Sequence, residues 1–239
     1  MPGRGVKVVM PAQRPGGREL KQTIARLLAE EGAAGVDRLA HVPGRRLVNP
    51  LFALFCDADE RVRWGAVGAM GRVVARLAGE SMESARVVVR RCLWNLNEES
   101  GGIGWGCAEA LGEVLALCPA LAREYAGILT AYLDPCGNYI EHPPLQAGVL
   151  WGVGRLGRTQ PELAAGAARL LPPFLCAPEP ALRGLAAWAA LPIADAGLAA
   201  DLQGLADDDA MFTLYESERL GRATVGAVAG RALALKVAS

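Results

Sequence analysis

The residues most able to do chemistry are few and widely spaced in this sequence. There are two histidines, His41 and His142, and six cysteines, none of which belongs to a C-x-x-C pair. Zinc binding and thiol–disulfide exchange usually need such pairs, so the cysteines predict neither. We find no Ser-His-Asp or Cys-His arrangement with a supporting spacing. The sequence therefore predicts no catalytic residue, no metal site and no cofactor.

Polar residues nevertheless gather in two equivalent turns, Asn97–Gly102 and Asn138–Pro143. Each turn directly precedes an apolar helical segment, and such positions favour side chains that cap a helix or complement its dipole. Capping is one interpretation, and a polar rim that contacts a partner or a metal is the other. The glycines from Gly101 to Gly104 could cradle an anion, but no Lys-Ser/Thr pair follows them as a P-loop requires. The candidate rim residues are Glu98, Glu99, Tyr139, Glu141 and His142.

Composition narrows the class of protein further. The formal net charge is zero and 52% of the residues are hydrophobic, so we expect a folded core without a general attraction to nucleic acid or anionic membranes. Apolar stretches are interrupted before they reach membrane-spanning length. Residues 1–17 lack the apolar core of a signal peptide and are expected to form a disordered leader. The cysteine pattern and this leader predict a cytoplasmic protein.

The rest of the chain repeats at a period near 40 residues. The segments that begin at Val62, Ile103, Leu145 and Leu182 follow one another at offsets of 41, 42 and 37 residues. Helical hairpins are predicted to alternate across residues 47–191, with capping helices over residues 18–46 and a helical cap over residues 192–239. No strand is expected. Periods of this length predict an all-α fold, a right-handed α-α superhelix of about four to five helical hairpins.

Tryptophans recur at two positions in the second helix of each predicted hairpin. If the first core aliphatic is position 0, then positions 0, 4, 7 and 8 are apolar or small in every repeat and form the buried stripe. At 100° per residue, positions 2 and 6 lie almost opposite that stripe. We therefore expect the indoles there to keep exposed edges on a groove; the alternative is that a tight superhelix or a terminal segment folded over the groove makes them part of the core. These positions hold Trp64, Trp105, Trp151 and Trp188.

Glycines also recur at equivalent positions, including Gly65, Gly106 and Gly148. Glycine inside a helix costs about 1 kcal/mol relative to alanine, so its recurrence is best explained by close packing of neighbouring helices. Contact between the backbone and a ligand is the alternative.

The repeat length, the acidic turns and the Asp-x-x-Val-Arg start at Asp59–Arg63 resemble the HEAT and HEAT-like repeat families, including the repeats of phycobilisome lyases. The resemblance covers residues 47–191. It implies that the second helices line a concave groove, and it implies little about function, because HEAT arrays serve as scaffolds, adaptors, glycosylases and lyase subunits. Deoxyhypusine hydroxylases of this class carry repeated His-Glu pairs, whereas this chain has one reversed pair, Glu141-His142.

Together these observations favour a non-catalytic scaffold or adaptor that binds another protein through a Trp-lined concave groove. Glu109 and Arg155 are expected beside the indoles, where they would help to set the register of the partner. The alternative is a lyase-like or glycosylase-like HEAT enzyme or accessory protein that holds a tetrapyrrole or a nucleic-acid base, with Glu109 or Glu141 as acid or base. Mixed charges on this face disfavour nucleic acid.

Overall fold

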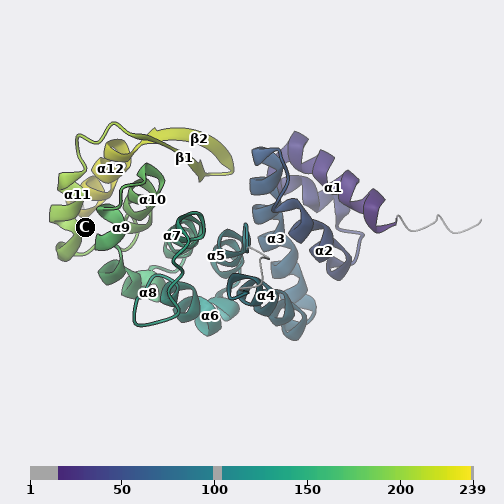
Figure 1. Cartoon of the computed structure of the whole chain (residues 1–239). Helices are drawn as coiled ribbons and strands as arrows, with labels where there is room; N and C mark the ends of the chain where they lie inside the picture. The colour runs from purple at the N-terminus through teal and green to yellow at the C-terminus, as the bar shows by residue number, and fades with distance from the viewer. Residues whose placement is uncertain (1–15, 99–103, 238–239) are drawn as a thin grey trace, which may run out of the picture.

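The computed structural model describes residues 16–98 and 104–237. Helices follow one another around an arc, and the C-terminal segment lies across the opening of that arc (Figure 1). The predicted α-α superhelix is confirmed. The N-terminal part consists of α1 (Gly17–Glu31), the 3₁₀ segment η1 (Gly32–Leu39), α2 (Gly44–Leu54) and α3 (Glu60–Glu80). The middle consists of α4 (Met82–Leu96), α5 (Cys107–Leu117), α6 (Pro119–Ala131) and α7 (Pro143–Gly157).

The fourth hairpin differs from the others because its first helix is broken. Instead of one helix it has α8 (Pro161–Ala164), the 3₁₀ segment η2 (Ala165–Leu170) and α9 (Pro172–Leu175), followed by the second helix, α10 (Pro180–Ala190). Proline removes a backbone donor and clashes with the preceding turn, so Pro172 and Pro173 end one short helical run and start the next.

Each second helix packs on the second helix of the next repeat, in the order α3, α5, α7 and α10. The predicted phase of these helices is confirmed, since Leu111, Val149 and Val153 are completely buried. Ile103, which is expected in the same stripe, lies outside the described residues. The core therefore runs as one continuous layer between the inner and outer helices.

Glycine allows unusually close contact between α5 and α7. A Cβ atom added to Gly112 would lie 2.3 Å from the Cα of Gly152, which no real side chain could occupy. A Cβ on Gly154 would lie 2.4 Å from the ring of Trp188 on α10. Gly112 and Gly154, which with Gly71 recur at another equivalent position of the second helices, are therefore explained by helix packing, as predicted for the recurring glycines.

The C-terminal segment contains a β-hairpin, which contradicts the expectation of helices alone. After η3 (Ala196–Leu198) and α11 (Ala199–Gly204), strand β1 (Met211–Glu216) pairs antiparallel with β2 (Arg219–Thr224), and α12 (Val225–Val237) follows. The two-residue turn has positive φ at Ser217 (52°) and Glu218 (60°), the backbone that matches the twist of paired strands. Asn-Gly or Asp-Gly is usual there, so the turn carries no strong sequence signal.

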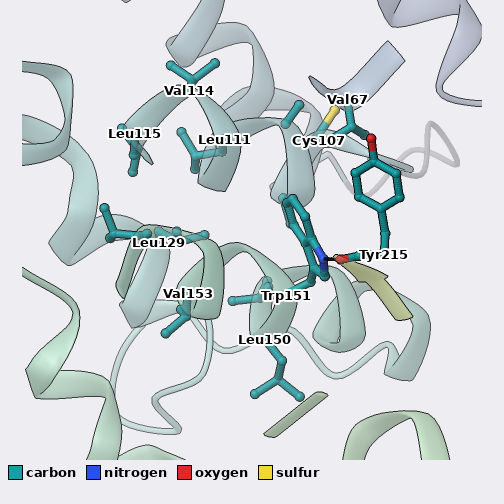
Figure 2. Packing of buried hydrophobic residues seen from close by; sticks show 14 of the residues in the cluster. Val67, Cys107, Leu111, Val114, Leu115, Leu129, Leu150, Trp151, Val153 and Tyr215 are labelled. Carbon is teal, nitrogen blue, oxygen red and sulfur yellow. Dashed lines mark hydrogen bonds between the residues drawn. The ribbon is translucent and has the colours of Figure 1, made fainter. Parts of the chain in front are cut away.

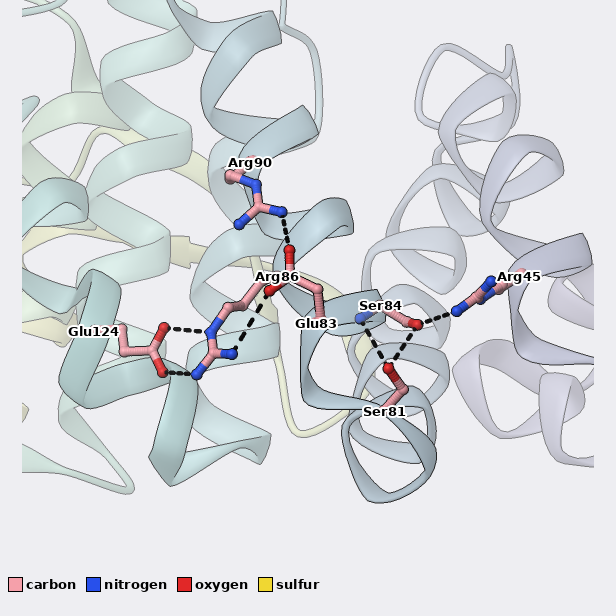
Figure 3. Close-up of polar contacts among 7 residues, drawn as sticks. All are labelled: Arg45, Ser81, Glu83, Ser84, Arg86, Arg90 and Glu124. Atoms are coloured by element: carbon pink, nitrogen blue, oxygen red, sulfur yellow. Dashed lines mark hydrogen bonds and ion pairs between the residues drawn. The ribbon is translucent and has the colours of Figure 1, made fainter.

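Polar contacts on the outer helices join neighbouring repeats (Figure 3). Arg86 on α4 makes two hydrogen bonds to Glu124 on α6, at 2.8 and 2.7 Å. Arg45 donates to Ser84, and Ser84 bonds to Ser81, which also caps the start of α4. Exposed pairs of this kind contribute about 0–1 kcal/mol each, so they set the arrangement of the repeats more than their stability.

Within residues 16–98 and 104–237, no helix is both long enough and apolar enough to cross a membrane.

Candidate functional site

The β-hairpin divides the concave face into two regions. Its strands extend from the C-terminal helices across the opening of the arc toward α3 (Figure 1). At its tip, Glu218 accepts a hydrogen bond of 2.7 Å from Arg72 on α3, and Arg72 also pairs with Asp37 at 3.0 Å. The hairpin therefore ties the last elements of the chain to the first repeat. We call the surface beneath it the hairpin-covered region.

Trp151 and Trp188 form the floor of the hairpin-covered region. The indole of Trp151 donates a 2.8 Å hydrogen bond to the backbone oxygen of Tyr215 on β1 (Figure 2). Trp188 stacks on Trp151 with 5.8 Å between ring centroids. Their exposed fractions are 2% and 1%, so the expectation that all four indoles keep exposed edges is wrong for these two. Their predicted helical phase is correct, but the hairpin covers them.

The same region already contains a cation held between an aromatic ring and a carboxylate. The guanidinium of Arg158 lies 3.6 Å from the centroid of the Trp188 ring, and its Nη2 is 3.4 Å from the carboxylate of Glu216. Glu216 also accepts from the indole of Trp188 at 2.9 Å and from Arg231 at 2.8 and 3.0 Å. Hydrogen bonding from Arg231 lowers the pKa of Glu216, whereas burial lowers the pKa of Arg158 to about 10.

Trp64 marks the boundary between the two regions. On one side its ring stacks on Tyr215, with centroids 4.8 Å apart, and tilts against Trp151 at 4.9 Å. On the other side it lines a cavity of about 680 Å³, which we call the open pocket. The side chain is thus partly buried, and part of it lines the pocket.

The open pocket lies where the first turns of four helices meet. It is lined from α3, α5, α7 and α10 and from the turns before them. Charged residues at the pocket are Glu60, Arg63, Glu109 and Glu179, and its aromatic residues are Phe55, Trp64 and Trp105. A cavity of this size, mostly apolar with a few convergent polar groups, has the character of a ligand or peptide site.

Trp105 is the most exposed indole of the pocket, with 39% of its surface exposed. It lies in the turn before α5, because that helix begins at Cys107, later than predicted. Gly106 has a left-handed backbone with φ of 71°, and a Cβ there would lie 2.8 Å from the ring of Phe55. A glycine is therefore needed at this point, and the turn rather than the helical phase directs Trp105 toward the pocket.

Of the three carboxylates at the open pocket, Glu109 is the most deeply buried. A Cβ on Gly148 of α7 would lie 2.7 Å from its carboxyl carbon, so the carboxylate packs directly against the α7 backbone. Burial raises the pKa of Glu109 to about 7, while the charge of Arg63 acts in the opposite direction. A carboxyl group that titrates near neutral pH in a cavity is a frequent mark of a functional site.

The remaining charges of the pocket are unevenly balanced. Arg63 forms a salt bridge of 3.2 Å with Glu60 and donates to the backbone oxygen of Asp57 at 3.2 Å. Glu179 is exposed and precedes α10, where it makes no side-chain capping bond. Three carboxylates therefore face one guanidinium, and that guanidinium is already paired with one of them.

The predicted rim residues lie at the edge of the pocket or outside it. His142 contacts Trp105 edge-on, with 5.5 Å between ring centroids, and Tyr139 accepts a hydrogen bond from Gln146 at 3.0 Å. Glu141 is exposed, Glu98 is partly buried, and Glu99 lies outside the described residues. None of these four described residues lines the open pocket.

Arg155, predicted to set the register of a partner, instead joins two helices. It makes a double hydrogen bond to Glu113 of α5, at 2.6 and 3.2 Å, beneath the hairpin. Sequence reasoning also missed Arg63, Glu179 and Tyr215 as residues of this face. Arg63 belongs to the repeat start at Asp59–Arg63, which by itself indicates the fold and no binding role, and the hairpin that carries Tyr215 has no repeating signal. Across the described ranges, no three His, Cys, Asp or Glu side chains gather as a metal site.

Comparisons with solved structures agree with this architecture. A designed armadillo repeat protein, YIII(Dq)4CqI, aligns over 93% of this chain and 95% of its own, with 18% identity and a TM-score of 0.55. A second, YIII(Dq.V1)4CPAF in complex with the peptide (KR)4, aligns over the same shares with 18% identity and a TM-score of 0.53. An engineered protein of the Northeast Structural Genomics Consortium covers 95% of this chain and 93% of its own, with 18% identity and a TM-score of 0.57.

At 18% identity, the similarity to these structures shows a shared fold and nothing more. No protein-family model matches the chain, and no curated protein matches it. The comparisons confirm a helical-repeat solenoid fold like that of the designed armadillo repeat proteins, and they give no particular support to the phycobilisome-lyase repeats.

Proposed function

We propose that this chain is a non-catalytic scaffold that binds another protein, and that an extended segment of the partner lies in the open pocket. The observation that carries the proposal is the pocket itself, a cavity of about 680 Å³ lined by the second helices of four successive repeats, with the exposed Trp105 and the half-buried Trp64 at its wall. Tryptophan is among the residues that contribute most to binding when a partner covers it.

The fold supports the same proposal. A designed armadillo repeat protein of similar fold is in complex with the peptide (KR)4, so a solenoid of this fold can bind a peptide. An extended peptide supplies its own backbone donors and acceptors, and pockets along the groove then select alternate side chains. The six free cysteines are consistent with the reducing cytoplasm, where we place the protein.

The proposal can be tested by selecting peptides from a random display library on the immobilised protein. Selected peptides should bind the Trp105→Ala variant at least about tenfold more weakly than the wild type, the loss expected from a central binding residue. Trp94→Ala is the matched control, because Trp94 lies on α4 and is 64% exposed but is not part of the pocket. Equal binding to both variants would contradict the proposal.

A second candidate function is supported by Glu109. A carboxyl group with a pKa of about 7 beside indoles is suited to acid–base chemistry on a flat ring, such as a nucleic-acid base or a tetrapyrrole. The three carboxylates of the pocket would repel a phosphate backbone. Steeply salt-dependent DNA binding that is lost in Trp105→Ala would favour this candidate over the scaffold.

A further inference from the structure

We propose that the open pocket binds the guanidinium group of an arginine side chain from the partner segment. This inference rests on the proposed function and deepens it, because it names the chemical group that the pocket recognises. Four features support it: the charge of the pocket, the lack of donors at two of its helix starts, its indoles and an equivalent arrangement elsewhere in the same chain.

The charge of the pocket favours a cation. Glu60, Glu109 and Glu179 are opposed by Arg63, which is paired with Glu60. Glu109 and Glu179 take part in no ion pair within the ranges that the structure describes. A bound cation would complete the charge balance of these two carboxylates, and it would do so in a cavity partly screened from water, where charge pairs interact more strongly.

Two of the four helix starts at the pocket are poor sites for an anion. Helix N-termini normally attract anions through free backbone N–H groups. Here α7 begins with Pro143 and Pro144, and α10 begins with Pro180, so these first-turn positions have no N–H to offer. The pocket therefore presents carboxylate oxygens and ring faces, with few backbone donors.

The indoles suit a flat cation in particular. A guanidinium placed over the face of tryptophan is attracted by the ring quadrupole and also stacks on it, which an ammonium group does less well. Trp105, of which 39% is exposed, is the indole available for this contact, and Trp64, which packs against Tyr215 and Trp151, contributes to the pocket wall.

The hairpin-covered region shows the same combination in a complete form. There, the guanidinium of Arg158 lies over the Trp188 ring, 3.6 Å from its centroid, and reaches the carboxylate of Glu216. The open pocket offers an indole and a carboxylate of the same kinds, on the neighbouring part of the same face. An arginine of a partner could therefore contact an indole and a carboxylate in the open pocket, as Arg158 contacts Trp188 and Glu216 in the hairpin-covered region.

Binding of a guanidinium should depend on the ionisation of Glu109. A cation favours the carboxylate form, so binding should tighten as pH rises through about 7 and should release a proton near that pH. The other charged groups that face Glu109 are Arg63 and Glu60 from α3 and Glu179 before α10, and His142 lies next to Trp105. A His142→Gln variant would separate its contribution from that of Glu109.

The experiment compares two labelled octapeptides on the full chain by fluorescence anisotropy at pH 8. One alternates arginine with serine, and the other replaces each arginine by citrulline, which keeps the shape but removes the charge. We expect the arginine peptide to bind about tenfold more tightly than the citrulline peptide to the wild type. In Glu109→Gln this ratio should fall below about threefold, whereas it should be unchanged in the exposed control Glu162→Gln.

Calorimetry in buffers of different ionisation enthalpy provides a second readout. At pH 7, arginine-peptide binding to the wild type should release about half a proton, because Glu109 is about half protonated at its pKa. Glu109→Gln should release none. Equal affinity for both peptides, or an unchanged ratio in Glu109→Gln, would overturn the inference.

Failure of this inference can be distinguished from failure of the proposed function. If peptides selected from the display library depend on Trp105 but lack arginine, the scaffold function stands and the guanidinium inference is wrong. If neither the selected peptides nor the arginine octapeptide depends on Trp105, both are wrong.

Discussion

The hairpin-covered region and the open pocket are built from the same parts. Both lie on the inner helices, and both combine indoles with a carboxylate. In the first, Tyr215 and Glu216 from the hairpin seal Trp151 and Trp188 from water. In the second, Trp105 remains exposed and Glu109 titrates near neutral pH. An aromatic groove face thus becomes core where the chain supplies its own occupant, and remains a candidate binding site where it does not.

The largest difference between the regions should appear on truncating their indoles. Trp188→Ala should lower the free energy of unfolding by about 3–5 kcal/mol, because it leaves a cavity beneath the hairpin and removes the ring under Arg158. Trp105→Ala should cost much less, about 1 kcal/mol, since that residue is already 39% exposed and lies in a turn. Urea denaturation of both variants measures the two values, and similar losses would contradict the division of the groove.

A smaller effect is expected for Trp151→Phe. The change keeps an aromatic ring but removes the indole N–H that bonds to the Tyr215 oxygen, so a buried acceptor loses its partner. We expect a loss of about 2–3 kcal/mol, together with faster amide hydrogen exchange in β1 and β2. Trp94→Phe on the outer face is the matched control. Unchanged exchange in the hairpin would show that this bond does not hold it.

The Glu109→Gln variant tests whether the buried charge of Glu109 in the open pocket makes the stability of the protein depend on pH. The folded-state pKa of Glu109, about 7, lies above its ordinary value of 4.5, so ionisation of Glu109 destabilises the fold as pH rises between these values. The variant should therefore be more stable than the wild type by about 3 kcal/mol at pH 8, with the difference shrinking toward pH 5. Thermal unfolding across this range measures it. A difference independent of pH would mean that burial of the Glu109 charge is not its cause.

The smallest effect concerns the tip of the hairpin. Arg72→Gln removes exposed pairs to Glu218 and Asp37, and such pairs contribute about 0–1 kcal/mol. The change should leave global stability nearly unaltered while increasing hydrogen exchange at Ser217 and Glu218. A loss comparable to that of Trp188→Ala would mean that the tip contact, rather than the buried indoles, holds the hairpin.

The helical repeats could be predicted because their signal is local and periodic. Apolar positions four and seven residues apart predict the correct buried stripe, and Leu111, Val149 and Val153 are its members. The hairpin could not be predicted in the same way. It is held by Phe212 and Tyr215 against helices far away in sequence, and its Ser217-Glu218 turn lacks the usual hairpin residues. Burial of Trp151 depends on that distant contact.

The candidate site could be predicted in part. Trp64, Trp105 and Glu109 are indicated by their repeat positions, and all three line the open pocket. Trp105 nevertheless reaches it from a turn, because Gly106 adopts a left-handed backbone and the helix begins only after it. The helix face of Arg155 suggests a role in binding, but the neighbouring helix supplies Glu113 as its partner. Helical phase predicts the face of a side chain, whereas its partner depends on the neighbouring repeat.

The most direct test of the division of the groove uses the indole N–H signals of the five tryptophans in a ¹⁵N-labelled sample. The arginine octapeptide is added while these five signals are followed. We expect the signals of Trp105 and Trp64 to shift, and those of Trp151, Trp188 and the outer-face Trp94 to stay in place. Shifts at Trp151 and Trp188 with an unmoved Trp105 would contradict this division, because they would mean that the partner displaces the hairpin and the open pocket is not the binding site.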